Sequence, residues 1–471
     1  MKNTMFNLFE ITEQSFWKRL TLLYSLVFGL MLTYPTTIFW DDWLVYDFKD
    51  RQSFIASDWM SGFAPWRAHF ESLLLEIGPG AFRFVSFVSI FVSAIALNRT
   101  LMFLNYLNKS EIKIITCLFL FLPLFSVRVA MCLTNYSVST ALFFLASFIL
   151  ITKSSRAWMI VSTILFILSF GTSSLLVFSA LPLLIKLFTL RKSQRASISS
   201  GVIGVALLAI SVPSYWIINR KFNPSKIDAL NTYYTPTALG TLKALALGIV
   251  LTLSLYILYK INRSIYSRNL KMLSFGFFAL WCGSAPYMTL GHIPTLYDWI
   301  ILSVPNAGDW NGRHQLLMPL GFSFILLAVF NWISNGQPKK SATAAVLISI
   351  FLSFSYSYEF YLDSLKQNET IAMIESSKVL SGSSHVMVED LTEQLNARGR
   401  KFRDYEWEAI LNHASNSQRN IKALPLARIS CSDFPADFVL RISSSQGRLH
   451  ALFTRHFGIE IEKDTTTQCK N

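Results

Sequence analysis

The residues best suited to chemistry are two adjacent acids, Asp41 and Asp42, which lie between Trp40 and Trp43 directly after the first long apolar segment. A carboxylate flanked by aromatic side chains can accept a proton from a hydroxyl group, and such general-base work favours a carboxylate whose pKa is raised. Two adjacent carboxylates also suit a divalent cation. The structural alternative is that one or both cap the start of a helix. We predict that both acids are catalytic, with a divalent cation as an open cofactor question.

A second polar segment, residues 291–315, is rich in Gly and Trp and runs directly into an apolar stretch that begins at Arg313 and His314. Arginine can bind phosphate through two parallel hydrogen bonds, and a helix N-terminus adds a favourable dipole for an anion. The alternative is that Arg313 extends to membrane phosphates while His314 packs at the interface. We predict that this segment contacts substrate through His292, Asp298, Arg313 and His314.

Four further side chains are candidates for substrate or phosphate contact. Arg67 and His69 fall in a short amphipathic pattern that is typical of a helix lying on a membrane surface. Arg83 and Arg128 lie near the ends of the second and third apolar segments. A charge in such a place either contacts a ligand, extends to the membrane surface or pairs with an acid such as Glu76.

The elements that must position these residues are apolar helices. The chain is 52% hydrophobic and 15% charged, whereas an ordinary soluble domain carries about 25% charged residues. A helix that crosses a membrane needs about 20 mostly apolar residues. We therefore predict an all-α polytopic membrane protein with about eleven spans, of which the fifth and sixth form either two crossings or a re-entrant pair. The spans lie near residues 19–38, 82–105, 112–129, 136–152, 157–171, 174–190, 199–217, 238–259, 272–290, 313–333 and 342–358.

The net charge of +14 has an uneven distribution along the chain. Residues 359–471 hold 14 of the 42 Lys and Arg but 15 of the 28 Asp and Glu, so the positive excess lies entirely in residues 1–358. A nucleic-acid-binding protein would instead carry a basic face on a soluble domain. We therefore predict membrane lipids as partners and no nucleic acid.

Basic residues fall in alternate connections between the apolar segments, which by the positive-inside rule face the cytoplasm. This places the N-terminus inside and the C-terminus outside, together with all seven His and nearly all the acids. The predicted regions are an interfacial N-terminal helix over residues 1–18, a transmembrane domain over 19–358 with an outer loop at 39–81, and an outer C-terminal domain over 359–471. The basic residues of the inner connections are Lys18, Arg19, Lys109, Lys113, Lys153, Arg156, Lys186, Arg191, Lys192, Arg195, Lys260, Arg263, Arg268, Lys271, Lys339 and Lys340.

The C-terminal domain has a balanced charge and mixed polarity, which predicts one small, mostly helical or α/β domain. Its pattern favours helices over residues 365–380 and 388–414 and a short strand at 439–442. Ser445 is a candidate N-cap for a further helix that reaches about Phe457.

The Asp-Asp pair of the Trp40–Trp43 segment, in a long first outer loop, resembles the membrane glycosyltransferases of the GT-C type, and Asn311–Gln315 fits less firmly. Size, short inner loops and an outer C-terminal tail resemble the serotype-converting O-antigen glucosyltransferases of bacteria and phages. The resemblance implies a polyprenyl-phosphate-linked sugar as donor, a surface glycan such as lipopolysaccharide O-antigen as acceptor, and a multi-pass location in the bacterial inner membrane with a periplasmic C-terminus.

Other classes of membrane protein remain open at this point. An O-antigen polymerase or ligase also uses outer loops and arginines, and it would differ in taking an oligosaccharide-diphosphate lipid as donor. A lipid-linked glycan transporter would carry ionisable or broken-helix sites near the middle of the membrane, and the apolar segments contain few such charges. A structural membrane protein would leave the acids, His and Arg at one face unexplained.

Overall fold

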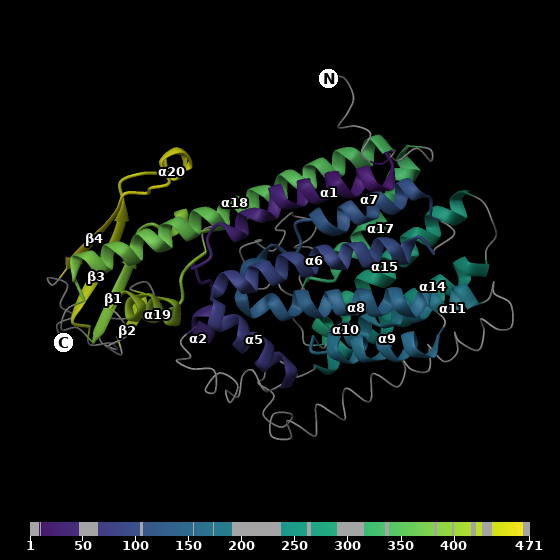
Figure 1. The fold of residues 1–471 in the computed structure, drawn as a ribbon, viewed down its shortest axis with the longest axis horizontal. Helices are drawn as coiled ribbons and strands as arrows, with labels where there is room; N and C mark the ends of the chain where they lie inside the picture. The colour runs from purple at the N-terminus through teal and green to yellow at the C-terminus, as the bar shows by residue number, and fades with distance from the viewer. Residues whose placement is uncertain are drawn as a thin grey trace.

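Most of the described chain is helical in this computed structural model. The helices form a bundle of apolar elements at one end of the molecule, and a small sheet lies at the other end (Figure 1). The structure describes residues 9, 11–46, 65–103, 107–153, 155–172, 174–190, 237–260, 265–289, 315–334, 339–380, 384–397, 400–415, 421–425 and 436–464.

Three helical stretches in the described residues are long and apolar enough to cross a membrane. They are α6 (Pro79–Leu101), the stretch Met131–Thr152, and the long α18 (Lys339–Ser377). The second stretch consists of the 3₁₀ helix η3 (Met131–Leu133) and α8 (Thr134–Thr152). These helices are those of a membrane-associated protein, but they are fewer than the eleven spans that the sequence predicts.

The other helices of the bundle are shorter or less apolar over the described residues. Contacts between neighbouring helices join α6 to α8, α8 to α9 and α15 to both α14 and α17. The predicted span at 199–217 lies outside the described residues. The bounds are α1 (Glu13–Phe28), η1 (Gly29–Leu32), α7 (Lys109–Phe121), η2 (Ser126–Val129), α9 (Arg156–Ser169), α10 (Ser174–Phe178), α11 (Ala180–Leu190), α14 (Ala238–Lys260), α15 (Ile265–Thr289) and α17 (Met318–Ile333).

Two predicted boundaries fall inside continuous helices. The side chain of Thr12 caps α1 by accepting a hydrogen bond from the backbone N–H of Ser15, and α1 then passes residue 18 without a break. At the other boundary, α18 continues from its apolar half past residue 358 into the C-terminal domain. The sequence missed this continuity because the helix changes from apolar to polar without a Gly or Pro to end it.

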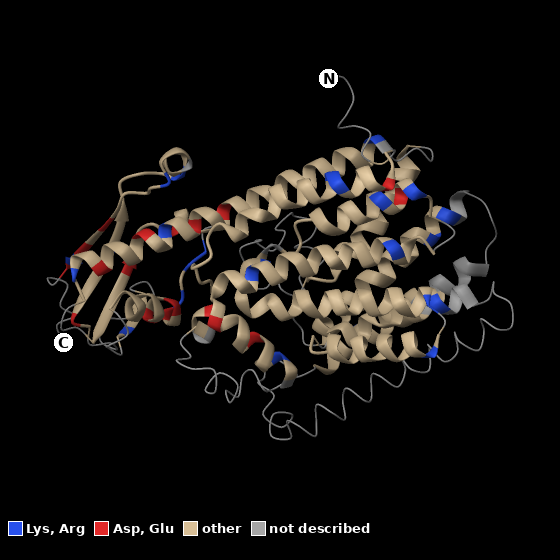
Figure 2. Ribbon diagram, viewed as in Figure 1, with Lys and Arg blue, Asp and Glu red and all other residues tan. Residues whose placement is uncertain are grey.

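Charged residues separate along the long axis of the molecule. Figure 2 shows Lys and Arg gathered at the end of the bundle that lies away from the sheet, while many Asp and Glu lie in and around the sheet. One exception is Glu111, which is buried at the basic end and forms an ion pair with Arg268. The distribution agrees with the sequence-based assignment of one basic and one acidic face.

The C-terminal domain is α/β. Its sheet has the strand order β2-β1-β3-β4, in which β1 is parallel to both neighbours and β3 is antiparallel to β4. The predicted strand at 439–442 is confirmed. The helix predicted over 388–414 is wrong in its first part, because residues 388–390 belong to the central strand β1 and the α-helix begins only at Asp404. The bounds are β1 (His385–Asp390), η6 (Glu393–Leu395), α19 (Asp404–Ala414), β2 (Lys422–Pro425), β3 (Phe438–Ser444), α20 (Arg448–Thr454) and β4 (Ile459–Asp464).

The loop at residues 39–81, which the sequence predicts to be an outer loop, is held against this C-terminal domain. In its described parts it contains α2 (Asp42–Tyr46) and α5 (Pro65–Ile77). Ile38 and Trp43, which flank the Asp-Asp pair, are buried in the same apolar cluster as the strands and α19. The pair therefore lies where the bundle, the outer loop and the C-terminal domain meet.

Candidate active site

Asp41 is the partly exposed member of the acidic pair. Its Oδ1 accepts a hydrogen bond of 2.7 Å from the hydroxyl of Tyr405, a residue of α19 that lies 364 positions away in the sequence. Burial, and then the bond to Asp41, raise the pKa of Tyr405 well above its ordinary value. The phenol therefore stays protonated and keeps donating to the carboxylate.

Asp42 has a different environment. Its side chain is fully buried, and its two oxygens accept hydrogen bonds from the backbone N–H groups of Met131 at 2.7 Å and Cys132 at 2.9 Å. These are the first residues of the helical stretch that leads into α8, so Asp42 caps a helix that lies far away in the sequence. Burial raises the pKa of Asp42 to about 6, although the hydrogen bonds from Cys132 and Met131 and the charge of Arg83 act in the opposite direction.

The backbone at Trp40, directly before the two acids, has a rarely adopted conformation. Trp40 has a φ of 48°, in the left-handed region that bulky residues rarely adopt. The turn is closed by the N–H of Asp42, which donates to the carbonyl of Phe39, and by the N–H of Trp43, which donates to the carbonyl of Trp40. Such a conformation costs about 1–3 kcal/mol and persists only when its surroundings hold it in place.

Gln367 and Arg400 supply part of that support. The side-chain amide of Gln367, on α18, pairs with both backbone groups of Ile38, accepting from its N–H and donating to its carbonyl. The guanidinium of Arg400 lies over the ring of Trp40, 5.2 Å from its centre, and over Phe39 at 5.6 Å. Two residues of the C-terminal half therefore hold the backbone on which Asp41 sits.

Arg400 is itself held by two buried carboxylates. Its Nε lies 2.7 Å from Asp363 on α18, and its Nη1 lies 2.6 Å from Glu406 on α19. All three side chains are at most 5% exposed. Burial lowers the pKa of Arg400, but Asp363 and then Glu406 more than offset this, so that the pKa is raised above its ordinary value. This triad joins α18, α19 and the turn at Trp40.

Arg83 is placed by the structure in a supporting position. It is 1% exposed, and its guanidinium donates to the backbone carbonyls of Val129, Tyr34 and Thr37. Its hydrogen-bonding groups thus face the chain that leads to the acidic pair. In this arrangement Arg83 is neither extended to the membrane surface nor exposed to a ligand.

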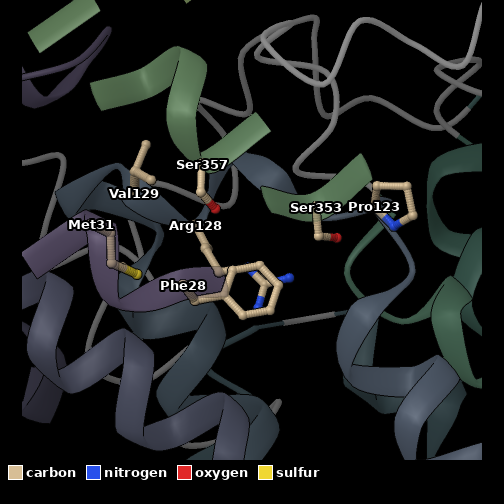
Figure 3. Close-up of a pocket in the computed structure, with 7 residues that line it drawn as sticks. All are labelled: Phe28, Met31, Pro123, Arg128, Val129, Ser353 and Ser357. Atoms are coloured by element: carbon tan, nitrogen blue, oxygen red, sulfur yellow. The ribbon is translucent and has the colours of Figure 1, made fainter. Parts of the chain in front are cut away.

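Arg128 lies beside a small cavity between the first helix and α18. The cavity is also lined by Phe28, Met31, Ser353 and Ser357, and the guanidinium of Arg128 lies 4.1 Å from the ring centre of Phe28 (Figure 3). Its Nη1 is buried and has no hydrogen-bond partner among the described residues. The cavity measures about 10 Å³, which is room for roughly one water molecule. A phosphate group would require this cavity to widen.

Arg67 and His69 lie on α5, and the predicted helix there is confirmed. The Nε of Arg67 is 2.7 Å from Glu71, whose side chain is fully buried. Burial raises the pKa of Glu71 even though Arg67 opposes the shift. His69 is exposed. The positive charge of Arg67 is therefore partly offset by the neighbouring Glu71 on the same helix.

The remaining four predicted residues, His292, Asp298, Arg313 and His314, lie outside the described residues. Their approach to Asp41 stays a prediction. The described chain resumes at Gln315, whose buried side chain lies at the start of the segment leading into α17.

Sequence reasoning missed the contribution of Tyr405, Arg400 and Gln367. Each belongs to the C-terminal half, and no periodicity or motif connects that half with the first outer loop. One signal was present: residues 363–367 carry Asp, Lys and Gln at helical spacing directly after an apolar segment. Polar residues on one face of a helix that leaves a membrane indicate a buried polar contact.

Within the described part of the chain, no group of three or more His, Cys, Asp or Glu side chains is arranged to hold a metal ion. The two carboxylates of the pair have separate partners, since Asp41 bonds Tyr405 and Asp42 bonds the backbone of Met131 and Cys132. A cation shared by both acids would have to displace one of these sets of bonds.

A comparison of the sequence with models of known protein families finds no match, and a comparison with curated proteins finds none either.

Proposed function

We propose that this protein is a membrane glycosyltransferase that moves one sugar from a polyprenyl-phosphate carrier to a hydroxyl of a surface glycan. The observation that carries the proposal is the Asp41 carboxylate, which is partly exposed, bonded to Tyr405 and located where the apolar helical bundle meets the C-terminal domain. A donor with a lipid tail and a water-soluble sugar requires a site at such a boundary.

Asp41 is the better candidate for the general base of the two acids. Asp42 is enclosed, and both of its oxygens are engaged by backbone N–H groups, so an acceptor hydroxyl cannot approach it without breaking the cap. In Asp41, the hydrogen bond from Tyr405 engages Oδ1, and among the described residues no hydrogen bond engages Oδ2. We therefore assign proton removal to Asp41 and a supporting role to Asp42.

The proposed reaction is a single displacement with inversion at the sugar carbon. The acceptor hydroxyl oxygen forms a bond to the anomeric carbon while its proton passes to Asp41. The bond between that carbon and the phosphate oxygen breaks, and the polyprenyl phosphate leaves with the electron pair. Arg313, assisted by Arg67 or His314, would stabilise the charge that develops on the phosphate.

The proposal includes the topology predicted from the sequence: about eleven spans in a bacterial inner membrane, a cytoplasmic N-terminus and a periplasmic C-terminal domain. The gathering of Lys and Arg at one end of the bundle supports this orientation (Figure 2).

A membrane-impermeant thiol reagent tests this orientation on intact cells, with Cys431 and Cys469 replaced by Ser. Leu391→Cys should react from outside, and Lys340→Cys should not. If Lys340→Cys reacted with the reagent, residue 340 would lie outside and the predicted orientation would be wrong.

The enzymatic test uses purified protein in lipid nanodiscs with a polyprenyl-phosphate hexose and a glycan acceptor. Asp41→Asn should lower the transfer rate by at least 10²-fold, because general-base catalysis contributes roughly 10²–10⁴-fold. Tyr405→Phe should lower it about ten-fold, since it removes one hydrogen bond to a charged group, worth about 1.5 kcal/mol.

The matched control is Glu460→Gln, which neutralises an exposed carboxylate on the edge strand β4 and should keep the full rate. A normally inserted Asp41→Asn variant that retained wild-type activity would remove Asp41 from the mechanism. An oligosaccharide-diphosphate lipid accepted in place of the monosaccharide donor would instead indicate a polymerase or ligase.

A further inference from the structure

A short helix in the C-terminal domain exposes two large apolar side chains. In α20, Leu449 is 77% exposed and Phe453 is 82% exposed. The two residues are four positions apart, so they lie on the same face of the helix. Ala451 of the same helix is buried against the domain. The helix thus has one face packed on the protein and an apolar pair directed away from it.

The helix is fixed to its surroundings at both ends. At its first residue, the Nη2 of Arg448 donates to the backbone carbonyl of Asn396 at 2.6 Å. After it, the backbone N–H groups of Phe457 and Ile459 donate to the two carboxylate oxygens of Glu369 on α18, at 2.8 and 3.0 Å. Because α18 is the helix that enters the bundle, these bonds set the position of α20 relative to the membrane.

The position of α20 along the molecule matches the outer boundary of the bundle. In Figure 1 it lies nearer to the bundle than the strands β3 and β4 do, close to the level at which α18 leaves the other helices. The apolar half of α18 exposes Ile348 and Phe351, at 60% and 70%, as a side chain facing lipid would be exposed. If the apolar half of α18 crosses the membrane as proposed, the apolar pair of α20 lies just beyond that lipid-facing surface.

The charges beside the apolar pair fit the same environment. His450 and Arg455 are exposed next to Leu449 and Phe453. Apolar side chains with adjacent basic residues are typical of segments that lie at the boundary between phospholipid head groups and acyl chains, because phosphates attract the cations. The protein already spans that membrane, so the partner is always present.

We propose that α20 is a lipid-contacting anchor: Leu449 and Phe453 enter the head-group layer of the outer leaflet, and Arg455 lies among the phosphates. The anchor holds the C-terminal domain, and with it α19, at a constant height above the membrane. This inference rests on the proposed membrane topology and not on the proposed transfer reaction.

The test places a photoreactive phenylalanine analogue at Phe453 in the full-length protein, reconstituted in nanodiscs of phosphatidylethanolamine and phosphatidylglycerol. The matched control carries the analogue at Leu391, which is 49% exposed in the same domain but lies in the turn after β1. After irradiation, mass spectrometry should find phospholipid attached at position 453 at least ten times more often than at position 391. The same analogue at Leu449 should give the same result as at Phe453.

Two outcomes would overturn the proposal. Equal lipid attachment at positions 453 and 391, or none at 453 and 449, would show that α20 does not enter the lipid. Covalent dimers formed through position 453 in place of lipid adducts would assign the apolar pair to a contact between two copies of the chain.

Discussion

At the scale of single residues, Asp41 and Asp42 are adjacent and of the same type but have different surroundings. Asp41 faces a phenol from another domain and is partly exposed, whereas Asp42 is enclosed and bonded to the start of a helix. A left-handed turn at Trp40 lies directly before both acids. The sequence predicts a catalytic pair, and we propose instead one base, Asp41, with Asp42 as its structural partner.

The raised pKa of Asp42 has a consequence for stability. The folded-state pKa is about 6 and the ordinary value is 3.8, so folding favours the protonated form. The stabilisation is fully present below about pH 4 and is lost as the pH rises through about 6, with a total of about 3 kcal/mol. Asp42→Asn cannot titrate and should lack this dependence.

Thermal unfolding in detergent measures the difference. The melting temperature of the wild type, relative to that of Asp42→Asn, should fall between pH 4 and pH 7. A gap between the two proteins that stays constant over this range would contradict the burial of a titrating Asp42.

At the scale of elements, the site depends on the junction of α18 and α19. The triad of Arg400, Asp363 and Glu406 is buried there, and Arg400 also covers the ring of Trp40. Lys366 on the same face of α18 is buried too, bonded to Asp390 and Asn396. A helix that leaves the membrane thus carries the polar contacts that fix the outer domain.

Removing Arg400 should cost far more than removing a similar surface ion pair. Arg400→Ala leaves two buried carboxylates unpaired, and breaking such a network costs about 3–5 kcal/mol. Arg441→Ala is the control, because its bond to Glu389 is partly exposed and such pairs are worth about 0–1 kcal/mol. Equal losses of thermal stability in the two variants would show that the triad does not hold the junction.

Local sequence patterns predicted several helices and strands correctly, but they did not predict contacts between residues far apart in the sequence. The amphipathic pattern at Arg67 and His69 predicted α5, and the apolar run at 439–442 predicted β3. The contact between Tyr405 and Asp41 spans 364 positions, and no period of 2 or 3.6 residues carries such information. For the same reason the proposed cap at Ser445 was wrong: α20 begins later, after Gly447, and its ends are set by Asn396 and Glu369.

At the scale of the whole molecule, basic and acidic residues are separated along the long axis. Lys and Arg gather at one end of an apolar bundle, and the acidic pair, α19 and the sheet lie at the other (Figures 1 and 2). We interpret the net charge of +14 as a signal of orientation in a membrane. The proposed transfer would take place at the sheet-bearing end, where a lipid carrier and a soluble glycan could both be reached.

The most direct test of the central claim is the mass of the surface polysaccharide repeat unit in bacteria with and without this protein. We predict that the wild-type protein adds one sugar to the repeat unit, and that Asp41→Asn, inserted in the membrane at the same level, adds none. A repeat unit of unchanged mass in cells that contain inserted wild-type protein would contradict the proposed transfer.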